Sequence, residues 1–216
     1  MYVRILIHYK KAGATEAAPR PRSKPQGKLI VELIINYNLP ICQDKITMAI
    51  LRCTKKLLTE LKTKPSEGTT SSDEMGSWHA NLLRVDRRKC ILFTHDVTLY
   101  SFLLPGLKKP QFENFREVFG QNLFKNLIWE KFPQNQIEIV LDEHREIIIA
   151  KTNNRSVLGS MNDLAFQLKY RIAAMGGLTN VDLAELNHEL NRIPMSAIKE
   201  IYSIYELRKL LNKLST

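Results

Sequence analysis

The stretch KTNNRSVLGSMND, residues 151–163, holds the densest group of polar and charged side chains in the chain. The apolar run IIIA (147–150) precedes it, and apolar residues at helical spacing follow it from Leu164 to Met175. This change of pattern predicts a strand, a turn and then a long helix. The glycine pair at 176–177 is expected to end that helix.

The predicted strand-to-helix turn is the first candidate binding site. Backbone N–H groups at a helix start, with cationic side chains beside them, favour an anion. In a functional interpretation, Arg155 clamps the anion and Asp163 acts as an acid or base or contacts a metal. In a structural interpretation, asparagines and Ser156 cap the helix, and Gly159 lets it pack closely on the sheet. The candidate binding residues are Lys151, Asn153, Asn154, Arg155, Ser156, Asn162 and Asp163.

A basic turn supplies a secondary candidate site. Arg87 and Arg88 lie in the turn between two strand-like runs, and Trp78 and His79 begin the first run. A basic hairpin tip can contact phosphate groups. The alternative interpretation is an ordinary solvated turn.

Familiar catalytic and metal-binding motifs are absent from the sequence. Residues 151–163 have neither the GxxxxGK[ST] nor the GxGxxG spacing, the histidines occur singly, and no GxSxG is present. We therefore predict no metal site and assign no cofactor. Three cysteines without metal-type spacing suit a reducing cytoplasm. No run approaches the ~20 apolar residues that a membrane span needs, so no membrane partner is expected.

The first 47 residues differ in composition from the rest. They hold 8 Lys/Arg against 3 Asp/Glu, a surplus of 5 that matches the surplus of all the remaining residues. We predict a poorly ordered basic extension over 1–47, either a basic arm or an upstream artefact of the gene model, and one domain over 48–216. Acids and bases alternate in that domain, which leaves nucleic acid as one candidate partner rather than the expected one.

The alternating patterns predict an α+β domain. Strand-like runs occur at 49–53, 78–85, 89–94, 98–104 and 147–151, and apolar residues at helical spacing fill most of the other segments. The aromatic residues of the helical run over 112–128 are expected to form core. Short turns between consecutive strands favour antiparallel pairing. We expect an antiparallel sheet of four to five strands, helices packed mainly on one face, and a helical C-terminal tail.

Four runs together carry a resemblance: RCTKKLLTELK (52–62), WHANLLRVDRRKCILFTHDVTLYSFLLPGL (78–107), KTNNRSVLGSMNDLAFQ (151–167) and LNRIPMSAI (190–198). They resemble a family of small bacterial proteins classed only as a domain of unknown function. The resemblance extends over residues 48–214 and implies that the domain begins at residue 48. It implies no activity and no catalytic residues.

Two functions remain open. Because no catalytic constellation is recognisable, we expect a non-enzymatic cytoplasmic module that binds a ligand or partner. The alternative is an enzyme acting on nucleotides or nucleic acid at residues 151–163. Convergence of Asn154, Arg155 and Asp163 in an open pocket with Trp78 or His79 would favour the enzyme.

Overall fold

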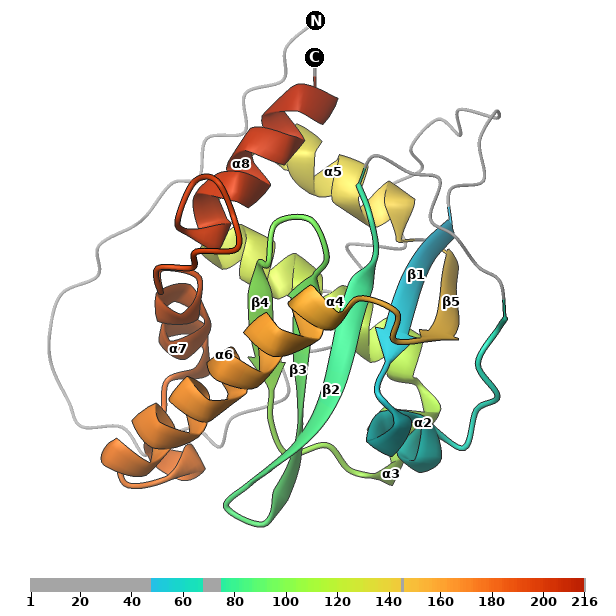
Figure 1. The fold of residues 1–216 in the computed structure, drawn as a ribbon, viewed down its shortest axis with the longest axis vertical. Helices are drawn as coiled ribbons and strands as arrows, with labels where there is room; N and C mark the ends of the chain where they lie inside the picture. The colour runs from blue at the N-terminus through green and yellow to red at the C-terminus, as the bar shows by residue number, and fades with distance from the viewer. Residues whose placement is uncertain (1–47, 68–74, 145, 216) are drawn as a thin grey trace, which may run out of the picture. The chain divides into compact units, whose positions relative to one another are not determined.

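The fold comes from a computed structural model that describes residues 48–67, 75–144 and 146–215. The predicted extension over residues 1–47 lies outside these ranges. The described part consists of one sheet with helices against it (Figure 1).

Five strands make up the sheet: β1 (Met48–Cys53), β2 (Trp78–Val85), β3 (Arg88–His95), β4 (Ser101–Leu104) and β5 (Glu146–Lys151). Their order across the sheet is β4-β3-β2-β1-β5. The β2–β3 and β3–β4 pairs are antiparallel, as the short turns between them predict. The first strand, β1, runs parallel to both of its neighbours, β2 and β5.

The expectation of a purely antiparallel sheet is therefore wrong, because the sheet is mixed. After β1, helix α2 (Lys55–Leu61) carries the chain back along the sheet, so that β2 pairs in parallel. The last strand, β5, pairs with β1 over its whole length from Met48–Glu146 to Cys53–Lys151. Neither pairing has a short turn in the sequence to reveal it.

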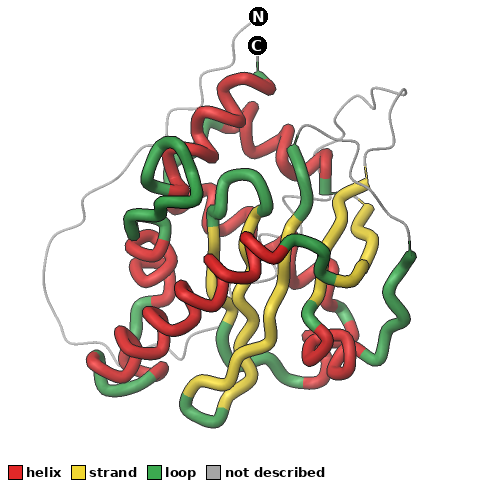
Figure 2. Tube along the Cα trace, in the orientation of Figure 1, coloured by secondary structure: helices red, strands yellow, loops and turns green. Residues whose placement is uncertain are grey.

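Helices occupy most of the rest of the described chain (Figure 2). Within the described ranges, no helix combines the length and the apolar character needed to cross a membrane. After α2 come α3 (Lys109–Glu113), α4 (Phe115–Trp129), α5 (Gln134–Glu143), α6 (Arg155–Ala174), the short 3-10 helix η1 (Leu178–Asn180), α7 (Leu183–Leu190) and α8 (Ser203–Leu214).

Apolar side chains line both faces of the sheet. On β3, Phe93 belongs to the cluster that contains Phe119 of α4, whereas the adjacent Leu92 belongs to a second cluster with Met161 and Leu164 of α6. Successive side chains of a strand point to opposite faces. Helices thus cover both faces, and the expectation that they pack mainly on one face is wrong.

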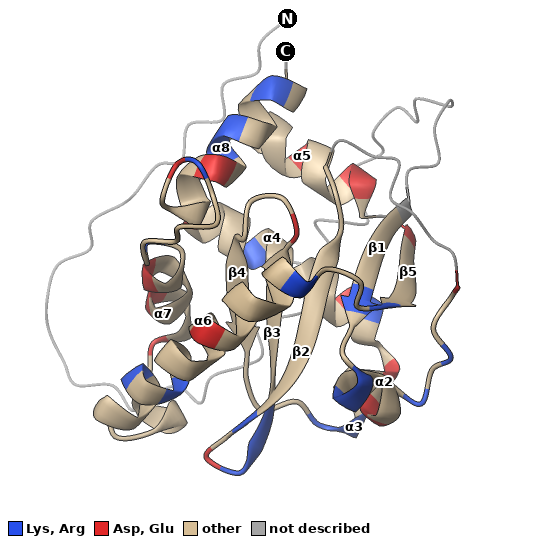
Figure 3. Ribbon diagram, viewed as in Figure 1, with Lys and Arg blue, Asp and Glu red and all other residues tan. Residues whose placement is uncertain are grey.

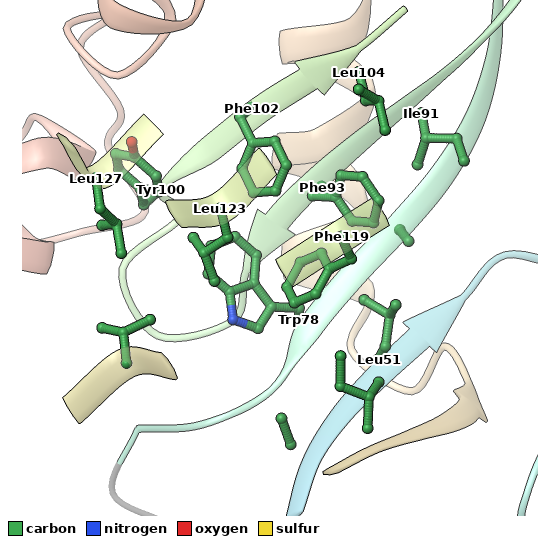
Figure 4. Close-up of a cluster of buried hydrophobic side chains, with 14 of the residues drawn as sticks. Leu51, Trp78, Ile91, Phe93, Tyr100, Phe102, Leu104, Phe119, Leu123 and Leu127 are labelled. Atoms are coloured by element: carbon green, nitrogen blue, oxygen red, sulfur yellow. The ribbon is translucent and has the colours of Figure 1, made fainter. Parts of the chain in front are cut away.

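Aromatic rings fill the core on the α4 side (Figure 4). The Trp78 ring lies with its centroid 5.4 Å from that of Phe119 and 5.7 Å from that of Phe102. Phe112 and Phe115 are also buried, so the prediction that these aromatic residues form core is confirmed. Burying each such side chain contributes about 1.5–3 kcal/mol.

The predicted helical tail is present and closes one edge of the sheet. Two asparagines, one in α7 and one at its C-terminal cap, form hydrogen bonds with the backbone of edge strand β4. Asn191 accepts from the Ser101 N–H at 2.7 Å and donates to the Ser101 carbonyl, while Asn187 accepts from the Leu103 N–H at 2.8 Å. An exposed strand edge invites pairing with another chain, and these side chains occupy it.

Candidate functional site

The strand-to-helix turn lies between β5 and α6. Asn154 is the N-cap residue of α6, and its side-chain oxygen accepts from the backbone N–H groups of Ser156 at 3.0 Å and Val157 at 3.2 Å. A helix-terminus anion site relies on these same first-turn donors. The structural interpretation is confirmed for Asn154, whereas Ser156 is the capped residue rather than the cap.

The other candidates at this turn are exposed. The side chain of Lys151 is 67% exposed, with its ammonium 3.8 Å from the Glu67 carboxylate. A Cβ placed on Gly159 would meet nothing within 4 Å, so this glycine does not serve close packing against the sheet. The remaining exposed candidates are Asn153, Arg155, Ser156, Asn162 and Asp163.

The secondary candidate divides into two separate places. Trp78 and His79 begin β2 and are only 2% and 0% exposed. Arg87 and Arg88 lie past the other end of β2, where the hairpin turns into β3, and both are exposed. The structure therefore does not bring the two halves of this set together.

A row of polar side chains crosses the sheet on the face covered by α6. Strand register aligns Arg52 with His79, His79 with Thr94, and Thr94 with Ser101. All four are buried, and the hydroxyl oxygens of Thr94 and Ser101 lie 2.9 Å apart in a hydrogen bond. Buried polar groups need such partners, because an unmatched one costs about 1–3 kcal/mol.

Asp96, just past the end of β3, joins this row into a charged cluster. Its carboxylate contacts Nδ1 of His79 in a hydrogen bond and lies 3.9 Å from Nε of Arg52. The Arg52 Nε also donates to the Ser77 hydroxyl at 3.2 Å. We call Arg52, Ser77, His79 and Asp96 the polar cluster. Sequence reasoning missed all of it except His79, because its members come from three separate segments.

Two further histidines lie on the opposite face of the sheet beside Trp78. The His95 ring centroid is 5.0 Å and the His144 ring centroid 6.1 Å from that of Trp78. Burial lowers the pKa of each histidine from 6.5 to about 4, because the charged imidazolium is poorly solvated there. Both rings are consequently neutral near pH 7.

The chemistry of the polar cluster is limited by its burial. A carboxylate on Nδ1 fixes an imidazole for proton transfer at its other nitrogen, as in hydrolytic triads. The Nε2 atom of His79 has no hydrogen-bond partner among the described residues. The ring has no exposed surface, however, so it cannot meet a dissolved substrate. The cluster is part of the core rather than an open site.

An open groove lies at the hairpin-tip end of the sheet. Its volume is about 1070 Å³, and three segments line it: the end of α2, the β2–β3 turn, and the segment from Gly106 into α3. Figure 3 shows Lys and Arg gathered on the hairpin tip and the neighbouring segments. The cations lining this basic groove are Lys62, Arg87, Arg88, Lys89, Lys108 and Lys109.

The hairpin turn places its arginines at the groove by an unusual backbone conformation. Asp86 and Arg87 have positive φ values of 46° and 63°, as a two-residue hairpin loop requires. The Asp86 carboxylate accepts from the backbone N–H of Leu178 at 2.6 Å. Gly177 allows this close approach, because a Cβ there would lie 3.0 Å from the carboxylate. The acidic residue of the turn is thus bound to the α6–α7 connection.

The cations of the basic groove are poorly matched by acids. Lys89 pairs with Glu60, and Lys109 lies 3.7 Å from the exposed Glu113. The other four, Lys62, Arg87, Arg88 and Lys108, have no ion pair among the residues that the structure describes. Phe112 also lines the groove, and the Lys89 ammonium lies 5.6 Å from its ring centroid. The groove therefore presents a strongly positive surface to solvent.

Sequence reasoning found only part of this groove. Arg87 and Arg88 are candidates in the sequence because they share a turn. Lys62, Lys108 and Lys109 lie in other segments, and no sequence motif connects them with that turn. The αL conformation of Lys62, φ 52°, ends α2 beside the hairpin. The sequence offers one signal, single cations next to the ends of predicted helices and strands, and such residues are too common to indicate a site.

Metal and thiol chemistry find no support in the described residues. No group of three or more His, Cys, Asp or Glu side chains there could hold a metal ion. Cys53 and Cys90 are free and buried. Burial raises the pKa of the Cys53 thiol to about 12, so it does not ionise near neutral pH.

The comparisons with known proteins identify the family. Residues 50–206 match a domain of unknown function, DUF6933, and the chain belongs to that family. The resemblance found in the sequence is confirmed at this level. A search of curated proteins and a search of solved structures each found no match.

Proposed function

We propose that this protein is a non-enzymatic binding module whose basic groove holds phosphate groups of a nucleic acid. The observation that carries the proposal is the set of four groove cations without an acidic partner among the described residues. Cations that serve the fold elsewhere in the molecule are paired: Arg192, for example, makes two hydrogen bonds of 2.9 Å to Glu130.

Nucleic acid suits the groove better than an acidic peptide. The six cations come from three segments around an open volume of about 1070 Å³, which gives room for several anionic groups in a row. Double-stranded DNA carries one charge per ~1.7 Å of its axis, so a short segment supplies enough phosphates to contact all six cations. Two of the six cations are arginines, whose planar guanidinium binds phosphate through two donors.

The composition of the groove favours binding without catalysis. Its lining, as far as the structure describes it, includes no His, Cys, Ser or Asp. At the turn after β5, the alternative enzymatic site, Asn154 caps a helix and the other candidates are exposed to solvent. His79, the proposed meeting point for an enzyme, is buried in the polar cluster. These placements support the binding module over the enzyme.

The same proposal includes a location in the bacterial cytoplasm. Two free cysteines persist most readily in a reducing compartment, and both Cys53 and Cys90 are free. The match to the family leaves this location open, so it remains a proposal.

The direct test is fluorescence anisotropy of a labelled duplex oligonucleotide with the full chain. Because phosphates release bound counterions when cations neutralise them, we expect log K to fall against log salt with a slope of about −3.5 to −4.5 for four or five contacts. Polyglutamate added as a competitor distinguishes the ligand class. Displacement by equal charge concentrations of polyglutamate, or a slope near zero, would contradict the proposal.

Paired charge reversals localise the binding. Arg87→Glu with Arg88→Glu should weaken binding by at least tenfold, because two attractive contacts become repulsive. Arg116→Glu with Lys125→Glu is the matched control, since it changes the net charge equally and both residues are exposed cations on α4 outside the groove. Equal losses in the two variants would show that net charge alone, rather than the groove, drives binding.

A further inference from the structure

The outer side of α6 carries an aromatic pair that the fold does not use. Phe166 and Tyr170 are 74% and 72% exposed, the largest exposed fractions among the apolar side chains of the described residues. They lie one turn apart on the side opposite the buried residues of α6, which include Met161, Leu164 and Leu168. Figure 1 shows this helix in front of the sheet with its outer side uncovered by other labelled elements.

Gly159 lies on the same side of α6 and has no structural reason to be glycine. It is exposed in the interior of the helix, its φ is not positive, and a Cβ there would meet nothing within 4 Å. Glycine in a helix interior is unfavourable relative to alanine, because it loses more backbone freedom on folding. We define the outer stripe of α6 as Gly159, Asp163, Phe166 and Tyr170. These residues follow the alternating three- and four-residue spacing of a helix–helix seam.

We propose that the outer stripe of α6 pairs antiparallel with the same stripe of a second copy of this chain. Pairing about the midpoint of the helix gives the longest overlap. It places Tyr170 of each copy over Gly159 of the other, and Phe166 beside Asp163. The missing side chain at Gly159 then makes the hole into which the tyrosine ring fits.

The charges of the stripe also match in this arrangement. Helical side chains lean toward the N-terminus of their own helix, so the Tyr170 hydroxyl reaches the level of Asp163 in the second copy. A hydroxyl that donates to a carboxylate makes a strong, charge-assisted hydrogen bond. The antiparallel arrangement also sets the positive end of each helix dipole beside the negative end of the other.

The expected dimer is weak. Each aromatic side chain can bury about 150–250 Å², so four of them supply about 600–1,000 Å² of the interface. This is below the ~1,200 Å² at which stable interfaces begin. We expect a dissociation constant of about 10–100 μM, with exchange between monomer and dimer.

Sedimentation velocity of the full chain from about 5 to 500 μM tests the pairing. The wild type should pass from monomer to dimer over this range. Gly159→Gln should remain monomeric, because the new side chain fills the hole for Tyr170. Its thermal midpoint should nevertheless rise by a few degrees, because glutamine is the better helix former and has open space around it.

Two further variants complete the test. Phe166→Lys should abolish the dimer, whereas Tyr205→Lys should keep it, since Tyr205 is 53% exposed on α8 outside the stripe. A wild type that stays monomeric at 500 μM overturns the proposal. So does a dimer that survives both Gly159→Gln and Phe166→Lys, because the contact would then lie elsewhere in the chain.

Discussion

The two ends of the β2–β3 hairpin use charge in opposite ways. Where β2 begins, the Asp96 carboxylate contacts both Arg52 and His79, and all three side chains have little or no exposed surface. At the turn, Arg87 and Arg88 stand in solvent and have no ion pair among the described residues. A charge that is buried and matched contributes to the fold, and removing its partner leaves it poorly solvated. A charge that is exposed and unmatched contributes little to the fold and is available to a ligand.

This contrast predicts that changes at the closed end of the hairpin weaken the fold, whereas changes at the open end affect binding. The largest effect is expected from pH. His95 and His144, on the other face of the closed end, have their pKa lowered by burial from 6.5 to about 4. Below pH 6.5 the unfolded chain takes up protons that the folded chain does not accept until about pH 4.

Lowering the pH from 7 to 5 should therefore reduce the free energy of unfolding by about 2 kcal/mol for each of the two histidines. Stability is complete above about pH 6.5 and falls as the pH drops toward 4. Urea denaturation at the two pH values measures this loss. His144→Gln should show a clearly smaller loss than the wild type, and an equal loss would mean that the pH dependence has another source.

Asp96→Ala should have the next largest effect. It removes the carboxylate that lies 3.9 Å from Nε of Arg52 and that binds Nδ1 of the buried His79, at a cost of about 3 kcal/mol. Arg88→Ala at the open end is the matched control and should change the free energy of unfolding by less than about 0.5 kcal/mol. Similar values for the two variants would remove the distinction between the ends.

Gly177→Ala should cost about 1–2 kcal/mol. Gly177 has φ 108°, and a Cβ there would press on the Asp86 carboxylate at 3.0 Å. Gly159→Ala provides the contrast, because its backbone is helical and its surroundings are open, so it should raise stability. Thermal unfolding of both variants gives the comparison, and a neutral Gly177→Ala would show that Asp86 is free to move.

The smallest expected effect is an increase in the free energy of unfolding. Arg87→Gly removes a side chain from a left-handed backbone position, φ 63°, and should stabilise the fold by about 0.5–1 kcal/mol. The same variant should bind the duplex oligonucleotide several-fold more weakly. Denaturation and anisotropy on one preparation measure both quantities. Loss of stability together with loss of binding would assign Arg87 a structural role.

Local patterns predicted the elements of this fold well and their assembly poorly. The hairpin and the aromatic core of α4 follow from residues close in sequence, and both are confirmed. The parallel pairing of β1 with β5 joins segments that share no turn, so spacing along the chain could not reveal it. Helices on both faces follow from β3, whose continuous apolar run supplies both clusters.

The candidate site shows the same limit. Arg87 and Arg88 were identifiable because the two residues share one turn. The lysines that complete the groove come from α2 and from the segment before α3, which only the fold brings together. Asp96 could not be identified from the sequence, because nothing near it along the chain marks it as the partner of His79.

The place of β1 between β2 and β5 has a consequence for synthesis. β1 leaves the ribosome before its partner β5, which follows almost a hundred residues later. At ~5–20 residues per second, one edge of the nascent strand stays unpaired for about 5–20 s. Non-local parallel pairing is also slow, since a long loop must close before any contact forms. During translation, the edge of β1 that β5 later covers is thus open to aggregation or to a chaperone.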